Sequence, residues 1–324
     1  MRNPDIIKQF LDTLVIGASQ TAEKLTMFPL CHKASEPRTY QVLEESISRE
    51  SGFVSEVSEA GSVPTLLFDN KGSQPVLLID GDTLTGAKQN RTLNISLLAP
   101  PQARIEIPVS CVEAGRWHRR SHHLGASPHH MYASGRARMM HDVHRSMEEG
   151  LGPRADQGEV WGDIDRKMGR MGVASPTRTM TDMFEHEGRS LEAIAEQITA
   201  APDQVGAIFV IDDRIAGLEL FDHPETLGIK LPKLVQSYAL DAIDDDATPE
   251  ECSIQTNEEL LLVIGSARRS EDRAVGLGLH TRLQAPGLIG TALSIDGHLV
   301  RLSAFPGTHS AAAPAMPPPR GSRT

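Results

Sequence analysis

Two runs of alternating apolar and polar residues, one on each side of a proline pair, constrain the fold more than any other feature. Apolar residues occupy every second position of 93–97 and again of 105–111, and Pro100-Pro101 lies between the runs. This period-two pattern around a turn is typical of a β-hairpin. The apolar faces coincide when paired residue numbers sum to about 202, because a slip of one residue would turn each apolar set to the wrong face.

The same register brings two polar stretches together at the open end of the hairpin. These stretches are Gly81–Arg91 and Ser110–Trp117, and Arg91 would lie opposite Cys111. A site is therefore expected at this end. Since Pro108 cannot donate a backbone hydrogen bond to a neighbouring strand, we expect its strand to lie at a sheet edge or to carry a bulge.

The residue types at the open end suit a polar, phosphorylated small molecule. Arginine forks bind phosphate or carboxylate with two hydrogen bonds, carboxylates can accept from a ribose hydroxyl or bind a metal, and an indole can stack on a base. The predicted ligand is therefore a small anion of the nucleotide type. The candidate ligand-binding residues are Asp82, Lys88, Gln89, Asn90, Arg91, Glu113, Arg116 and Trp117.

Two other interpretations of the hairpin end stay open. In the first, Arg91 and Glu113 form an ion pair at the margin of the core, and the amides tie down loop backbone. In the second, the strand near Pro108 is a partner-binding edge. If the ligand site is correct, Arg116→Ala should abolish ligand binding with little loss of fold.

Cys111 could be a nucleophile, because nearby arginines would favour its thiolate. Its position on the apolar face of the strand instead predicts a packed, inert thiol. The three cysteines are too few and too widely spaced for a disulfide framework or a zinc ribbon.

The charge of the chain is unevenly distributed. The net charge is -11, which disfavours general nucleic-acid binding. Only the segment 116–145 is basic, and it holds seven of the thirteen histidines. This segment could bind a metal or act as a basic lid over the anionic ligand, although no His-Glu-x-x-His motif is present. The candidate metal ligands are His118, His122, His141 and His144.

The remaining patterns predict an α+β fold. The first third reads as a β-rich sandwich or barrel-like sheet, and 118–134 reads as a loop. Apolar spacings of three and four from 136 to 198 predict three helices. The last third predicts antiparallel strands, with turns at Asp212-Asp213 and Asp296-Gly297, and one helix over Leu231–Ile243 that begins near Pro232.

The chain is expected to form one domain over 1–305, followed by a disordered tail at 306–324 that is rich in Pro, Ala and Ser. The domain divides into a β-rich part (1–117), a His-rich loop with helices (118–200) and an α+β part (201–305). No run approaches the roughly 18 apolar residues of a transmembrane helix, and no signal peptide is recognisable. We therefore expect a cytoplasmic protein that does not bind membranes.

A third group has the residue types needed for acid–base chemistry. It consists of Asp222, His223, Ser237 and Tyr238, whose spacing fits no hydrolase motif such as Gly-x-Ser-x-Gly. The simpler interpretation is structural: Asp222-His223-Pro224 caps or turns, and Tyr238 packs in the core with a hydrogen-bonded hydroxyl.

The hairpin motifs, together with Leu220–Pro224 and Leu234–Ala239, resemble a bacterial family of unknown function. This is the ARG and rhodanese-phosphatase-superfamily-associated protein domain, in which ARG denotes ADP-ribosylglycohydrolase. The resemblance extends from near the N-terminus to about residue 305. It implies a setting beside enzymes that handle NAD-derived or ADP-ribose-containing nucleotides, and it supplies no catalytic residues and no cofactor. The alternative to a ligand-binding protein is a non-enzymatic interaction or regulatory module with a protein partner.

Overall fold

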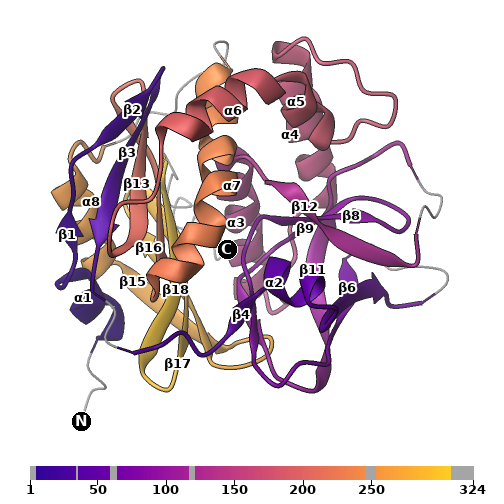
Figure 1. The fold of residues 1–324 in the computed structure, drawn as a ribbon, viewed down its shortest axis with the longest axis horizontal. Coiled ribbons are helices and arrows are strands. Elements are labelled where there is room, and N and C mark those ends of the chain that lie inside the picture. Colours follow the sequence, from indigo (N-terminus) through magenta and orange to yellow (C-terminus); the bar gives the residue numbers. More distant parts are fainter. Residues whose placement is uncertain (1–4, 34–35, 59–63, 117–120, 245–252, 308–324) are drawn as a thin grey trace, which may run out of the picture.

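The computed structural model has an α+β fold built from two bodies of strands. Figure 1 shows a barrel on one side of the molecule, a large sheet on the other and the long helix α7 (Pro224–Ile243) between them. The structure describes residues 5–33, 36–58, 64–116, 121–244 and 253–307.

The first body is a closed barrel, which confirms the barrel-like interpretation of the N-terminal third. Its strands follow the order β11-β6-β5-β12-β8-β9. Closing the sheet pairs strands that would otherwise expose their backbone groups. The barrel strands are β5 (Gly52–Glu56), β6 (Thr65–Asn70), β8 (Asp82–Gly86), β9 (Arg91–Leu93), β11 (Ala103–Cys111) and β12 (His123–His130).

The second body is a nine-stranded antiparallel sheet that combines both ends of the described chain. Its order is β1-β3-β13-β14-β18-β17-β16-β15, and β2 pairs with β3. The N-terminal strands therefore belong to this sheet and not to the barrel. The strands are β1 (Val15–Ile16), β2 (Gln20–Ala22), β3 (Leu25–Cys31), β13 (Gln204–Ile211), β14 (Arg214–Phe221), β15 (Arg268–Arg273), β16 (Leu279–Ala285), β17 (Leu288–Ile295) and β18 (His298–Pro306).

The predicted hairpin is correct at its open end and wrong at its turn. Val109 pairs with Leu93, and Cys111 pairs with Arg91, as the register requires. The same register would pair Leu97 with Ile105, but the chain leaves the barrel after β9. Residues Leu97–Ala99 form β10, which pairs with β7 (Val76–Leu78) in a small sheet completed by β4 (Gln41–Val42). An apolar period of two defines which face is buried and leaves the partner strand undetermined.

Pro108 lies where β11 changes its partner strand. Up to this residue β11 pairs with β6, and from Val109 onward it pairs with β9. The carbonyl of Pro108 accepts from the backbone of Asn94 at 3.1 Å, so the missing N–H falls at a break in the ladders. The register of β11 shows no bulge and the strand belongs to the closed barrel, so the proline is accommodated by this change of partner and not by the predicted sheet edge or bulge.

The loop predicted at 118–134 is wrong for its second half, where β12 closes the barrel. The strand pairs with β5 and β8 through backbone hydrogen bonds. Its buried positions include Leu124, Ser127 and His130, so polar residues take inward positions where an apolar alternation was sought. Composition could not identify a strand of this kind.

The middle segment contains four helices among the described residues where three were predicted. Gly150 and Gly172 follow the first two helices with φ of 74° and 66°, which a glycine adopts without strain, so they end the helices as expected. The unpredicted helix is a short turn of six residues before the last one. The helices are α3 (Ala133–Glu148), α4 (Gln157–Arg170), α5 (Thr181–His186) and α6 (Gly188–Gln197).

Both C-terminal hairpins form as predicted. Asp212 and Asp213 connect β13 to β14, and Asp296 and Gly297 connect β17 to β18. All four turn residues have positive φ, as the tight turns of right-twisted hairpins require.

Helix α7 begins earlier than predicted and continues through Pro232. His223 caps it by accepting from the backbone of Glu225 at 3.2 Å, and Pro224 takes the first turn, where a proline has no N–H to lose. Pro232 is exposed, and the residue four positions earlier is the exposed Gly228, so the proline ring meets little there. No helix of the described residues, α7 included, is long and apolar enough to cross a membrane.

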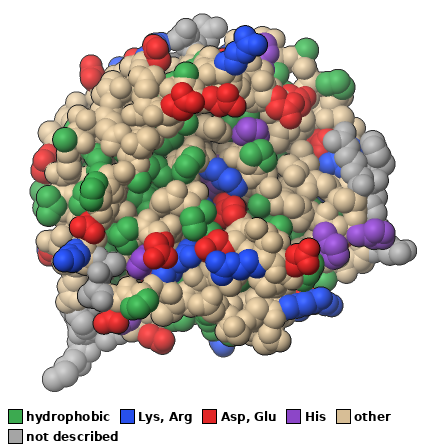
Figure 2. All heavy atoms as spheres, viewed as in Figure 1, with side chains coloured by type: hydrophobic (Ala, Val, Ile, Leu, Met, Phe, Trp, Pro, Cys, Tyr) green, Lys and Arg blue, Asp and Glu red, His purple; other side chains and the backbone are tan. Residues whose placement is uncertain are grey.

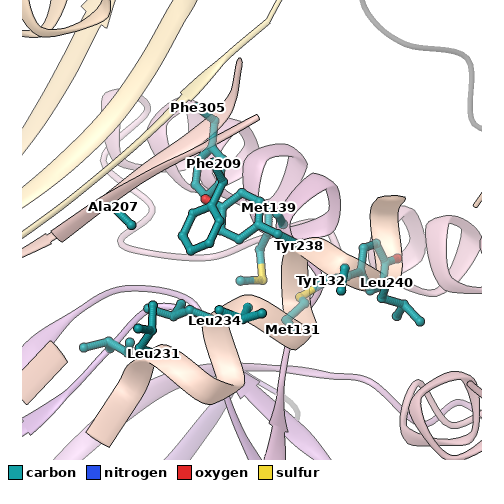
Figure 3. Close-up of a cluster of buried hydrophobic side chains, with 14 of the residues drawn as sticks. Met131, Tyr132, Met139, Ala207, Phe209, Leu231, Leu234, Tyr238, Leu240 and Phe305 are labelled. Atoms are coloured by element: carbon teal, nitrogen blue, oxygen red, sulfur yellow. The ribbon is translucent and has the colours of Figure 1, made fainter. Parts of the chain in front are cut away.

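The largest core cluster packs around α7 and β13. The rings of Phe209 and Tyr238 stack with centroids 4.0 Å apart, and Met131 and Met139 close the cluster on the side of α3 (Figure 3). Met139 and Met140 on α3 and Met168 on α4 are buried, so methionines that follow the apolar spacing of these helices belong to the core. Three short helices complete the fold and contribute buried residues to two smaller apolar clusters. Helix α2 (Leu43–Ser48) packs on the barrel, and α8 (Asn257–Ser266) packs on α1 (Ile6–Leu11).

Candidate functional site

Most of the residues predicted at the open end of the hairpin lie together, and they bond mainly to one another. The guanidinium of Arg116 donates from Nε and Nη2 to the two carboxylate oxygens of Glu113, at 2.9 and 2.6 Å. It also donates to the carbonyl of Ala87 at 2.8 Å and to the side chain of Asn90 at 3.2 Å. Both charged side chains are fully buried. This arrangement is that of a structural polar network.

Arg91 points into a second part of the same cluster. Its Nη1 donates to Gln89 at 3.0 Å, and its Nη2 lies 4.0 Å from the buried carboxylate of Glu56. Burial raises the pKa of Cys111 to about 11, although the charge of Arg91 acts in the opposite direction. The thiol is therefore protonated at neutral pH, which supports the inert interpretation of Cys111.

Three further predicted residues remain, of which one lies in the same loop, one lies elsewhere and one falls outside the described residues. Lys88 is half-buried in the loop between β8 and β9. Asp82 faces helix α7 at the other end of β8, where Lys230 contacts it. Trp117 falls outside the described residues.

The histidines predicted as metal ligands do not assemble into a site in the described part of the chain. His122 is exposed, His141 is half-buried, and His144 is buried on α3, whereas His118 falls outside the described residues. No group of three or more His, Cys, Asp or Glu residues with metal-binding geometry is found among the described residues.

A polar stripe along α7 joins two side chains that the sequence analysis interpreted as structural, Asp222 and Ser237, to three that it missed, Thr226, Lys230 and Lys233. Asp222 directly precedes the helix, and Thr226, Lys230 and Ser237 recur on one side of it, with Lys233 beside them. Residues four apart on a helix share a face, so this spacing was readable in the sequence. The stripe faces β12, β8 and the segment Tyr40–Glu44, which no sequence pattern placed there.

The centre of the stripe is a buried ion cluster. The ammonium of Lys230 lies 2.8 Å from both carboxylate oxygens of Asp82 and 2.8 Å from Glu44. On its other side, Asp82 is 3.5 Å from Nδ1 of His130. Burial alone would raise the pKa of Asp82, but the Lys230 charge and the His130 contact hold it well below its usual range. Asp82 is therefore a fixed negative charge.

Lys233 is the lysine of this cluster that reaches the surface, together with its partner Glu44. Its side chain is 19% exposed and donates to Glu44 at 2.9 Å and to the carbonyl of Ser127. Figure 2 shows basic and acidic side chains side by side in the middle of this face, over the area where Figure 1 places α7 and α2.

The stripe ends at a second partly accessible group, Asp222. The hydroxyl of Tyr40 donates to Oδ1 of Asp222 in a short hydrogen bond and lies 2.8 Å from the hydroxyl of Thr226. Burial raises the pKa of Asp222 to about 6, even though the hydrogen bond from Tyr40 lowers it. This carboxyl therefore changes its protonation state close to neutral pH.

Behind the stripe, a network of buried charges joins helices α3 and α7 to the large sheet. Glu219 accepts from Arg136 at 2.7 Å and from Tyr238 at 2.8 Å, and it also pairs with Arg301. Burial would raise the pKa of Glu219, but the two arginines lower it to about 2. Tyr238 thus packs in the core with a satisfied hydroxyl, and Ser237 donates to a backbone carbonyl at 2.7 Å.

Comparison with known proteins gives one match. No curated protein and no solved structure matches the chain. One family model matches residues 13–305, which include both strand bodies and the whole of α7. The description of that family associates its members with ARG and with the rhodanese-phosphatase superfamily. The chain therefore belongs to the family of the ARG and rhodanese-phosphatase-superfamily-associated protein domain.

Proposed function

We propose that this protein binds a small anionic ligand of the phosphorylated nucleotide type. The observation that carries this proposal is the pair Lys230 and Lys233, two ammonium groups one turn apart on α7, of which only Lys233 reaches the surface. The nucleotide class is what the family resemblance implies, if ARG in the family description denotes ADP-ribosylglycohydrolase.

Lys233 can bind a ligand at small cost to the protein. Its carboxylate partner Glu44 is also contacted by Lys230 at 2.8 Å, so Glu44 stays paired if Lys233 turns to a phosphate. A charge-assisted hydrogen bond to phosphate then replaces one to a carboxylate. Lys230 cannot turn to a ligand in this way, because its ammonium group pairs with both Asp82 and Glu44.

The open end of the hairpin is the second candidate location. It was predicted from Lys88, Arg91 and Arg116, and Lys88 is half-buried there. We place it second because Arg116 already bonds to Glu113, Ala87 and Asn90. A ligand would have to displace these internal bonds.

Ligand-induced stabilisation of the purified protein tests the proposal and locates the site. Thermal unfolding is measured with NAD, ADP-ribose and phosphorylated nucleotides, with and without divalent metal. A ligand at 100 times its dissociation constant adds about 2.7 kcal/mol to the free energy of unfolding. The shift should disappear in Lys233→Ala and persist in Lys88→Ala and in Lys33→Ala, which changes an exposed lysine elsewhere.

The opposite pattern, with loss in Lys88→Ala alone, would move the site to the hairpin end. If no ligand stabilises the protein, the proposal fails. The family description then favours the second candidate function, a non-enzymatic module that acts through a protein partner beside nucleotide-processing enzymes.

A further inference from the structure

The carboxylate of Asp222 keeps acceptor capacity that the protein does not use. The hydroxyl of Tyr40 donates to Oδ1, and no second side chain of the described residues donates to this carboxylate. An ionised carboxylate offers about four lone-pair sites. Asp222 is half-buried, so a ligand can reach it.

A chain of hydroxyl groups fixes the orientation of this carboxylate. Tyr40 has a single hydroxyl proton, which it donates to Asp222, so the 2.8 Å contact requires Thr226 to donate to Tyr40. Tyr40 is 4% exposed and Thr226 is fully buried. The buried side chains of Tyr40 and Thr226 thus fix the carboxylate of Asp222 as a hydrogen-bond acceptor near the surface.

Thr226 and Lys233 lie on the same face of α7, because they are seven residues apart. Thr226, which shares Tyr40 with Asp222, precedes Lys233 by two helical turns, which corresponds to about 10 Å along the axis. Both groups face the same short segment of the chain, because Tyr40 contacts Asp222 and Thr226, and Glu44 contacts Lys233.

We infer that Asp222, Tyr40 and Thr226 form a subsite for a sugar hydroxyl of the same ligand whose phosphate contacts Lys233. The inference rests on the proposed function, and it adds that the ligand carries a sugar hydroxyl as well as a phosphate. A carboxylate that accepts a hydrogen bond from a hydroxyl selects for a sugar, whereas a lysine alone binds any accessible phosphate.

The protonation of Asp222 gives the subsite a pH dependence. Burial raises its pKa to about 6, and this increase is opposed by the hydrogen bond from Tyr40, by a hydrogen bond from the backbone of Asp222 and by the charges of His223 and Arg38. Above pH 6 the ionised carboxylate accepts a charge-assisted hydrogen bond from a sugar hydroxyl. Below pH 6 the protonated group loses this strength.

Binding of adenosine 5′-monophosphate and of its 2′,3′-dideoxy analogue, measured by calorimetry at pH 7.5, tests the subsite. We expect the parent nucleotide to bind about 10 to 100-fold more tightly, as one hydrogen bond to a charged acceptor provides. The preference should vanish in Asp222→Ala, decrease in Asp222→Asn and fade in the wild type at pH 5.

Two further variants separate the subsite from the phosphate site. Lys233→Ala should weaken both nucleotides equally, and Asp213→Asn, an exposed change in the β13–β14 turn, should leave both affinities unchanged. A preference that survives in Asp222→Ala while Lys233→Ala weakens both would overturn the subsite and leave the proposed function standing. Absence of binding by both nucleotides would overturn the two together.

Discussion

Replacing Arg116 by alanine should strongly destabilise the fold. The change leaves the carboxylate of Glu113 buried without the donors that now lie 2.9 and 2.6 Å from its oxygens. Removing one partner of a buried pair costs about 3 to 5 kcal/mol. Domains are stable by only about 5 to 15 kcal/mol, so the loss is a large part of the total.

Urea unfolding followed by circular dichroism measures this loss. With a slope of about 3 kcal/mol/M, the midpoint should fall by roughly 1 M or more. Arg104→Ala is the matched control, because Arg104 makes a 2.8 Å pair with Asp69 but is 64% exposed, and such pairs contribute about 0 to 1 kcal/mol. The double variant Glu113→Ala/Arg116→Ala should recover part of the lost stability, because it also removes the unpaired buried carboxylate of Glu113.

The reasoning is refuted if Arg116→Ala costs no more than Arg104→Ala. A large cost has a consequence for the sequence-based expectation that Arg116→Ala abolishes ligand binding with little loss of fold. Lost binding in that variant would then reflect an altered protein, and it could not locate the ligand. Lys88 and Lys233 are better probes, because both are only partly buried.

Three further results are expected. Gly81→Ala should cost more than about 1 kcal/mol in urea unfolding, because φ is 88° and the new Cβ would lie 2.3 Å from Cδ of Arg136; an unchanged midpoint would contradict this geometry. The pKa of Asp222 is raised to about 6 by burial, so the folded state binds the proton more tightly than the unfolded chain. Its contribution to stability is complete below about pH 4 and is lost as pH rises through 6, and Asp222→Asn should remove this part of the pH profile; identical profiles would refute it. Cys111, with its pKa raised to about 11, should resist iodoacetamide in the native protein and react after unfolding, as mass spectrometry can show; rapid native labelling would mean that the thiol is accessible.

The sequence predicted those parts of the fold that depend on neighbours along the chain. Asp296-Gly297 between alternating runs specifies a tight turn, and the turn is present. The pairing of Cys111 with Arg91 followed from the same local logic. Such contacts can be predicted from the alternation of side chains along a strand and from the geometry of a turn.

The parts that were missed depend on distant segments. β12 was read as a loop because its inward positions include the polar residues Ser127 and His130, and the strand packs against α7, which lies about a hundred residues further along the chain. The contact of Lys230 with Asp82 joins residues 148 positions apart. A local pattern tells which face is buried and does not identify the element that covers it. The stripe on α7 was visible as a spacing, but its partners were not.

The position of β3 in the large sheet has a consequence for how the chain acquires its structure during synthesis. β3 pairs along its whole length with β13, which begins at residue 204. The ribosome adds about 5 to 20 residues per second, so Leu25–Cys31 waits roughly 10 to 35 s for its partner. The intervening residues encode the complete barrel, which can close while β3 has only β1 and β2 as partners and its other edge still lacks β13. An open edge of an apolar strand favours aggregation, so this interval is one in which a chaperone would act on the nascent chain.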